Sequence, residues 1–239
     1  MENNLYKNYT SVAVFSSEQE EEQFSAWGNL YFRKRIAPYL PANQEAAILE
    51  IGCGYGRFLV TMSQLGYQNV YGIDISEAQI RYAKEQLKLT NVAQADAVAF
   101  LQRPQHYDAI LLLDVIEHLE LDYAITLLTE IHRVLPSGGT LIIQAPNGLA
   151  PLSPNYYGDL THIRLYSPKT MGQLLSMSGF TQYLHHELPP IAHGIKSSVR
   201  KVLWSRVLQP LIKGYLLTAN GDSMGGIYTS NFLTVATKP

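Results

Sequence analysis

Apolar and polar residues alternate along this chain in blocks that predict strands and helices in turn. Short apolar runs with the length of buried strands occur at 46–51, 69–74, 92–95, 107–113 and 139–145. Segments with helical spacing of apolar residues lie between them, at about 57–66, 76–88, 97–102 and 121–134. This alternation predicts a mostly parallel sheet with helices on both faces.

The pattern continues on both sides of this region. A helix is predicted from about Glu20 to Tyr39, ended by Pro38 and Pro41. Two interpretations of it stay open: the helix covers the sheet, or it caps a cleft at the sheet edge. A further helix is predicted at 169–179, and residues 227–237 alternate like a strand.

Composition narrows the class of protein. The 239 residues, 46% of them hydrophobic, suit one α/β domain with additions. A net charge of −2 gives no general attraction to nucleic acid. The single cysteine, Cys53, excludes an internal disulfide, and seven histidines without ligand spacing predict no metal site. The absence of a signal peptide and of a long apolar run predicts a cytoplasmic protein without a membrane span.

The first predicted strand ends in a carboxylate and a glycine-rich loop. Glu50 is followed by Gly52, Gly54 and Gly56, which let the backbone turn sharply against a ligand. The spacing is GxGxG rather than the dinucleotide fingerprint GxGxxG, and no P-loop motif occurs. Since a phosphate would be repelled by Glu50, the loop favours a cationic ligand without phosphate.

Acidic residues also end the next strands, where ligands of such sheets bind. Asp74 lies 18 positions after Gly56, where its carboxylate can accept two hydrogen bonds from a ribose diol. Ser76 is the predicted N-cap of the following helix, which leaves Asp74 for that role. Asp96 either caps the 97–102 helix or binds a ligand.

Several of these segments resemble class I S-adenosylmethionine (SAM) methyltransferases. The run from Glu50 to Gly56 resembles their first motif, Glu-x-Gly-x-Gly-x-Gly. Asp-Val-Ile-Glu-His-Leu at 114–119 resembles the signature of small-molecule enzymes related to ubiquinone-biosynthesis O-methyltransferases, and Pro-x-Gly-Gly at 136–139 also matches. The resemblance spans residues 46–146. It implies a Rossmann-like, doubly wound, seven-stranded sheet that is mostly parallel, with an antiparallel last strand and a helical lid.

The resemblance also implies a cofactor site. SAM would be the methyl donor and S-adenosylhomocysteine the product. Residues from four strand ends would bind it. The methionine end would lie at Glu50, Gly52, Gly54 and Gly56, the ribose at Asp74 and Ile75, the adenine at Asp96 and Ala97, and the sulfonium region at Asp114.

The acceptor side is predicted from the Asp-x-Thr-His-x-Arg-x-Tyr cluster at 159–166. It resembles the substrate loop of methyltransferases associated with bacterial surface glycans. His162 is the first choice for a base, with Asp159 orienting it, and Arg164 and Tyr166 are predicted to contact substrate. The alternative is a loop held by its own hydrogen bonds. His118 is either a second base or a structural residue.

The chain is therefore divided into four parts. Residues 1–45 form a helical cap, 46–180 the SAM-binding core, 181–226 a lid, and 227–239 the last core strand. Residues 188–221 carry five cationic and no acidic side chains. A basic amphipathic helix of this kind either contacts an anionic membrane surface or packs as an ordinary lid helix.

The predicted function is methyl transfer from SAM, with O-methylation of a sugar or small hydroxylated metabolite favoured. N- or C-methylation of a small molecule stays open, as does a SAM-binding protein without methyl transfer. The GxGxG spacing disfavours an NAD-dependent oxidoreductase. A nucleic-acid methyltransferase is disfavoured because the chain has no basic domain and no Asn/Asp-Pro-Pro-Tyr motif after the fourth strand.

Overall fold

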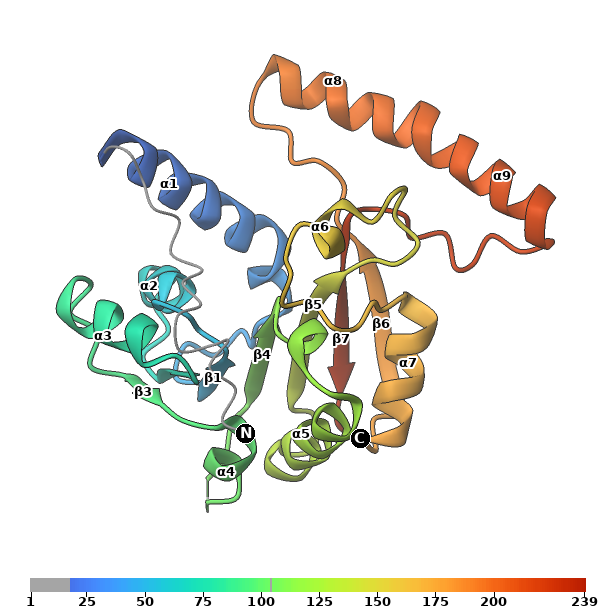
Figure 1. Cartoon of the computed structure of the whole chain (residues 1–239). Coiled ribbons are helices and arrows are strands. Elements are labelled where there is room, and N and C mark those ends of the chain that lie inside the picture. Colours follow the sequence, from blue (N-terminus) through green and yellow to red (C-terminus); the bar gives the residue numbers. More distant parts are fainter. Residues whose placement is uncertain (1–17, 104) are drawn as a thin grey trace.

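The computed structural model describes residues 18–103 and 105–239, with side chains from residue 26 onward. Part of the predicted N-terminal cap, residues 1–17, lies outside the described residues. Figure 1 shows one twisted sheet with helices on both sides and a long helix, α8 to α9, that stands away from the sheet.

Seven strands form the sheet in the order β3-β2-β1-β4-β5-β7-β6. Their bounds are β1 Ile48–Ile51, β2 Val70–Asp74, β3 Val92–Gln94, β4 Ala109–Leu113, β5 Thr140–Pro146, β6 Gln182–Glu187 and β7 Asn231–Thr237. The pairs among β1 to β5 are parallel, and β7 is antiparallel to both β5 and β6. The predicted Rossmann-like sheet with an antiparallel last strand is confirmed.

Helices cover the two faces of this sheet through two separate apolar clusters. Their bounds are α1 Glu18–Arg35, α2 Arg57–Gln64, α3 Glu77–Glu85, α4 Ala97–Leu101, α5 Leu121–Val134, α6 Pro154–Tyr157 and α7 Pro168–Met177. One cluster draws on α1, α2 and α3, and the other on α4, α5 and α7. Strands β1 and β4 contribute to both clusters, so their residues are buried on each face, as the continuous apolar runs predict.

The flanking segments differ from the sequence prediction in two places. The first helix ends at Arg35 and is followed by the separate 3₁₀ turn η1, Ala37–Tyr39, because Pro38 cannot continue the α-helix. The segment expected as a lid from residue 181 begins with β6, which pairs with β7 along its whole length. Within the predicted lid, the part that follows β6 and lies outside the sheet is therefore residues 188–226.

The long helix is formed by α8 Ile195–Leu203, the π-helical turn η3 Trp204–Leu208 and α9 Gln209–Asn220. No helix of the described residues is long and apolar enough to cross a membrane.

The parallel register brings the carboxyl ends of β1, β2, β3 and β4 to one edge of the sheet. Glu50 pairs with Gly72 in β2 and with Leu111 in β4, so the loops that follow these strands begin side by side. This edge is where an open α/β sheet binds its ligand.

Candidate active site

A cavity of about 710 Å³ opens at this edge. It is lined by the ends of β1, β2 and β4, by the start of α4, and by residues from the loop after α6. Eight of the nine predicted cofactor residues line it: Glu50, Gly52, Gly54, Asp74, Ile75, Asp96, Ala97 and Asp114. The predicted acceptor residues His118, Asp159 and His162 line the same cavity.

The ninth residue, Gly56, has a packing role. It is the N-cap of α2 in the left-handed conformation, at φ +85°, and a Cβ there would lie 2.4 Å from Leu89 Cδ1. Gly56 is not among the cavity-lining residues, so the structure gives it a role in close helix packing, and its cofactor contact stays a prediction. Gly52, at φ +73°, does line the cavity, and a Cβ there would clash with Val115.

Glu50 is a carboxyl group buried beneath the glycine loop. It is 2% exposed, and Oε2 has no hydrogen-bond partner among the described residues. Burial raises the pKa of Glu50 to about 8, against the opposing effect of the Arg57 guanidinium. A buried carboxyl of this kind is ready to ionise when a cationic group binds beside it.

Asp74 ties the glycine loop to the end of β2. Its Oδ2 accepts from the Gly54 backbone N–H at 2.8 Å, and Oδ1 accepts from the Ser76 N–H at 2.8 Å. Each carboxylate oxygen can accept a second hydrogen bond, so the side chain can still meet a diol. Ser76 caps α3 by accepting from Gln79 N, as predicted.

Asp96 caps α4 by accepting from the Ala99 N–H at 2.9 Å. The Tyr123 hydroxyl donates to its other carboxylate oxygen at 2.7 Å. The capping role weighed for Asp96 is therefore present, and it leaves the side chain on the cavity wall beside Ala97.

Asp114 ends β4 in the left-handed region, at φ +58°. Gln144 donates to its Oδ2 at 2.6 Å, and Asn231 donates to its Oδ1 at 3.0 Å. The Tyr31 hydroxyl of α1 donates to the amide oxygen of the same Gln144. Burial raises the pKa of Asp114 to about 6, partly offset by Gln144. Strands β4, β5 and β7 and helix α1 thus fix this carboxylate.

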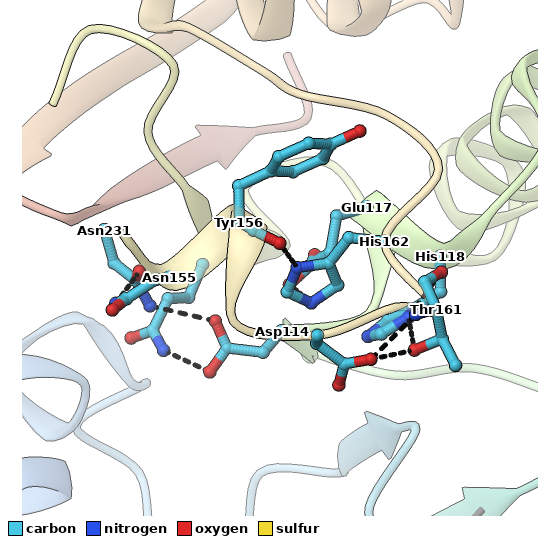
Figure 2. A network of polar contacts seen from close by, with 10 residues as sticks. Asp114, Glu117, His118, Asn155, Tyr156, Thr161, His162 and Asn231 are labelled. Atoms are coloured by element: carbon cyan, nitrogen blue, oxygen red, sulfur yellow. Dashed lines mark hydrogen bonds and ion pairs between the residues drawn. The ribbon is translucent and has the colours of Figure 1, made fainter. Parts of the chain in front are cut away.

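His118 is held by the loop that follows α6 (Figure 2). The Thr161 N–H and hydroxyl donate to Asp159 Oδ1 at 2.8 and 2.6 Å. His118 Nδ1 lies 2.9 Å from the Thr161 hydroxyl oxygen and 3.2 Å from the Thr161 carbonyl. Asp159 therefore orients His118 through Thr161, whereas the sequence predicted that it would orient His162.

His162 lies between Tyr156 and Glu117. Its Nδ1 is 2.9 Å from the Tyr156 carbonyl, and its Nε2 is 3.8 Å from Glu117 Oε1. The ring centroids of His118 and His162 are 4.6 Å apart. Burial lowers the pKa of His118, and burial together with Asp114 holds the pKa of Glu117 well above its ordinary value.

Glu117 was not predicted as a site residue, although it lies within the Asp-Val-Ile-Glu-His-Leu motif. Its carboxyl group and the His118 and His162 rings each offer a ligand atom, and these atoms lie within 4.8 Å of one another. The sequence did not predict this set of ligand atoms, because His162 lies 44 positions beyond His118. The structure therefore assembles a group of metal-ligand type where the sequence indicated none.

The two predicted substrate residues do not line the cavity. Tyr166 is 3% exposed within the apolar cluster beside α7, and its backbone bridges Asn147 at the end of β5. Arg164 is half-buried, with its backbone N–H on the Glu117 carbonyl. The backbone after Ile163 returns to β5, and a substrate contact of either side chain stays a prediction.

Comparison with known proteins decides the family. A family model described as a methyltransferase domain matches residues 21–185. The chain belongs to this methyltransferase family. Its fold and motifs are those of class I methyltransferases, whose cofactor is SAM.

Two curated methyltransferases illustrate the range of relatives. Phosphoethanolamine N-methyltransferase of Plasmodium falciparum is 27% identical over 146 residues, which are 60% of this chain and 54% of that protein. Ubiquinone biosynthesis O-methyltransferase of Rickettsia felis is 29% identical over 116 residues, 47% of this chain and 46% of that protein. This methyltransferase thus spans about half the length of the curated relatives it matches.

Solved structures show the same methyltransferase fold. A SAM-dependent methyltransferase from Archaeoglobus fulgidus has a TM-score of 0.67 and 23% identity, covering 92% of this chain and 98% of that one. Phosphoethanolamine N-methyltransferase 2 of Haemonchus contortus, solved with SAM, has a TM-score of 0.59 and 21% identity, covering 89% and 52%.

Proposed function

We propose that this methyltransferase transfers the methyl group of SAM to a hydroxyl of a sugar or small hydroxylated metabolite. The observation that carries the proposal is the composition of the cavity. Carboxylates line it at the strand ends, and His118 and His162 line it next to the buried Glu117. The first set suits a cationic nucleoside without phosphate, and the second suits activation of an acceptor hydroxyl.

The cofactor would lie across the strand ends. The ammonium group of SAM would be placed near Glu50, the ribose diol at Asp74, and the adenine beside Asp96 and Ala97. Asp114 would lie by the sulfonium, whose positive charge its carboxylate would attract. These positions are supported by the shared cavity and by the burial of the Glu50 carboxyl group.

The transfer would be an in-line displacement at the methyl carbon. The acceptor oxygen loses its proton and forms a bond to carbon, while the carbon–sulfur bond breaks and sulfur keeps the electron pair. The product S-adenosylhomocysteine is neutral at sulfur. Since the sulfonium is a good leaving group, positioning of the acceptor provides much of the rate.

The choice of oxygen as acceptor atom rests on the histidine cluster. An alcohol is weakly acidic and needs help to lose its proton, whereas a neutral amine attacks through its own lone pair. The curated relatives include both N- and O-methyltransferases, so they do not favour either atom. The test is a panel of hydroxylated and amine acceptors, with formation of S-adenosylhomocysteine as the readout. Turnover on amines alone would contradict O-methylation.

Calorimetry with SAM, S-adenosylhomocysteine and NAD separates this function from two others. SAM binding without turnover on any acceptor would favour a binding protein, and NAD binding would favour an oxidoreductase. We expect binding of the two adenosyl compounds only.

The raised pKa of Glu50 predicts that SAM binding releases a proton. With a pKa of about 8 it is protonated at pH 7 in the cofactor-free protein, and a cationic ligand favours its ionised form. SAM binding at pH 7 should therefore release close to one proton, and SAM affinity should rise between about pH 6 and 8. Calorimetry in two buffers of different ionisation enthalpy measures this release. Glu50→Gln should abolish it, and proton release that persists in that variant would place the titrating group elsewhere.

We also propose that α1 and residues 188–226 form a lid over the cavity. Two contacts join them: the rings of Trp27 and His193 lie 5.1 Å apart, and the Arg35 guanidinium donates to the Pro189 carbonyl. The Tyr31 hydroxyl continues this link to Gln144, and through it to Asp114. The cap and the lid would thus act as one unit above the cofactor.

An exposed row of apolar side chains on the long helix suggests where this protein contacts a surface that carries its acceptor. Apolar side chains recur every four residues and are 44–86% exposed: Ile195, Val199, Leu203, Val207, Leu211 and Tyr215. Residues four apart lie on one side of a helix, and the wider π-helical turn limits the drift of this row. Five cationic and no acidic residues lie in the same segment. We propose that this face contacts an anionic membrane surface.

Vesicle sedimentation tests the membrane contact. The protein should bind vesicles of equal parts phosphatidylglycerol and phosphatidylcholine. It should bind vesicles of phosphatidylcholine alone much more weakly. Each cation contributes about a fivefold change in affinity, so R200Q/K201Q should bind about 25-fold more weakly. The matched control R81Q/K84Q removes two exposed cations from α3 and should bind like wild type.

A second copy of the chain is the competing occupant of this face. Concentration-dependent dimerisation that V199S/L203S abolishes, together with no binding to anionic vesicles, would contradict the membrane contact.

A further inference from the structure

Three groups that can accept hydrogen bonds converge beside the cavity. His118 and His162 line it, and the buried Glu117 carboxyl group offers a ligand atom within 4.8 Å of theirs. Glu117 and His118 lie in the 3₁₀ turn η2, Ile116–His118, and His162 lies in the loop after α6. The loop is held to the turn because the Ile163 and Arg164 N–H groups both donate to the Glu117 carbonyl, at 3.0 and 3.1 Å. The convergence is therefore built into the backbone.

The hydrogen bonds fix which nitrogen of each ring carries the proton. A carbonyl oxygen only accepts, so His162 Nδ1 donates to Tyr156 and His118 Nδ1 donates to Thr161. The Thr161 hydroxyl uses its own proton on Asp159, which again makes His118 Nδ1 the donor. In the neutral rings, Nε2 is therefore the lone-pair nitrogen of both histidines (Figure 2).

Glu117 completes the set with a buried carboxyl group. The residue is 0% exposed, and neither carboxyl oxygen has a hydrogen-bond partner among the described residues. Its Oε1 lies 3.8 Å from His162 Nε2, too far for a shared proton. Acceptors that face one another in a buried place need either an added proton or a bound cation between them.

We propose that Glu117, His118 and His162 bind a divalent first-row transition-metal ion, which holds the acceptor hydroxyl. Two imidazole nitrogens and one carboxylate are a donor set that suits zinc and its neighbours and leaves a position for substrate. Ligand atoms at ~2.1 Å from a tetrahedral ion lie about 3.4 Å apart, close to the 3.8 Å between Glu117 and His162.

The contacts behind the histidines support this assignment. Histidines that bind metals donate their other ring N–H to a carbonyl or carboxylate, which fixes the ring and the tautomer. His162 does so to Tyr156, and His118 does so to Thr161, which is held in turn by Asp159. The Asp159 carboxylate thus supports His118 through Thr161.

This inference rests on the proposed O-methylation and specifies how the hydroxyl is activated. A bound ion lowers the pKa of an oxygen ligand, so the acceptor hydroxyl loses its proton to water and remains on the ion as an alkoxide. The alkoxide oxygen then takes the methyl group from sulfur. His118 and His162 hold the ion, and neither accepts the proton itself.

Calorimetry on the chelator-treated full chain tests the site with Zn²⁺, Co²⁺ and Mn²⁺. Wild type should bind one ion of at least one of these metals, and bound Co²⁺ should show the visible absorption of an ion with protein ligands. Glu117→Gln and His162→Asn should each weaken binding at least about tenfold. The matched controls, Glu130→Gln and His106→Gln, remove a carboxylate and a histidine outside the cavity and should bind like wild type.

Thermal melting and SAM calorimetry on each variant show whether it is folded. The inference is overturned if wild type takes up none of the three ions, or if Glu117→Gln binds them as tightly as wild type. SAM binding without ion uptake would sink the ion site alone, whereas ion uptake without SAM binding would sink the proposed methyl transfer.

Discussion

Asp74→Ala should weaken SAM binding by about 2–3 kcal/mol, or roughly 30- to 150-fold. Two effects combine. The variant loses the proposed acceptor of the ribose diol, and it releases the Gly54 N–H that Asp74 holds at 2.8 Å. The glycine loop would then be less well ordered against the cofactor. Isothermal calorimetry with SAM measures the change.

Asp108→Ala is the matched control. The Asp108 carboxylate also accepts from a backbone N–H, that of Ala47 at 2.8 Å, but it lies at the opposite end of the sheet, before β4. Its loss should lower the free energy of unfolding by about 1 kcal/mol and leave SAM affinity unchanged. If Asp74→Ala binds SAM as tightly as this control does, Asp74 is not part of the cofactor site.

His162→Gln should lower turnover at least about 100-fold while SAM affinity stays within about threefold. The ring lies next to Glu117 and His118 in the wall of the cavity, whereas the proposed cofactor contacts lie at the strand ends. The loss should therefore fall on transfer rather than on cofactor binding. Formation of S-adenosylhomocysteine with an acceptor from the panel gives turnover, and calorimetry gives affinity.

His106→Gln serves as the control for this variant, because His106 is exposed and lies outside the cavity. It should match wild type in both measurements. Turnover of His162→Gln at the wild-type rate would remove the 159–164 loop from the chemistry.

The fold and the cofactor side of the site could be predicted from neighbouring residues. Buried parallel strands are continuous apolar runs, and the turns that follow them carry glycine or a capping residue. Since parallel strands end at one edge, Glu50, Asp74, Asp96 and Asp114 had to come together once the alternation of strand and helix was recognised. Gly56 is the exception, because it does not line the cavity and its left-handed conformation serves the packing of α2.

The acceptor side was predicted less well, because a loop has no periodic pattern that fixes where each side chain lies. Asp-x-Thr-His-x-Arg-x-Tyr contains chemically capable residues, yet Tyr166 is in the apolar core and Asp159 supports His118 instead of His162. Glu117 was not predicted because a glutamate inside a motif gives no sign that its side chain is fully buried. Nor does it show that, within the described part of the chain, neither carboxyl oxygen has a hydrogen-bond partner.

The sequence by itself determined the order of the elements, the glycine loop, the acidic strand ends and the cationic character of residues 188–221. These features depend on residues close together in the chain, where spacing and backbone preference act directly. Only the tertiary structure decided that His162 meets Glu117 and His118, and that α8 to α9 leaves an apolar row exposed. Those features depend on contacts between distant segments, such as the Ile163 and Arg164 N–H groups on the Glu117 carbonyl, which no local pattern specifies.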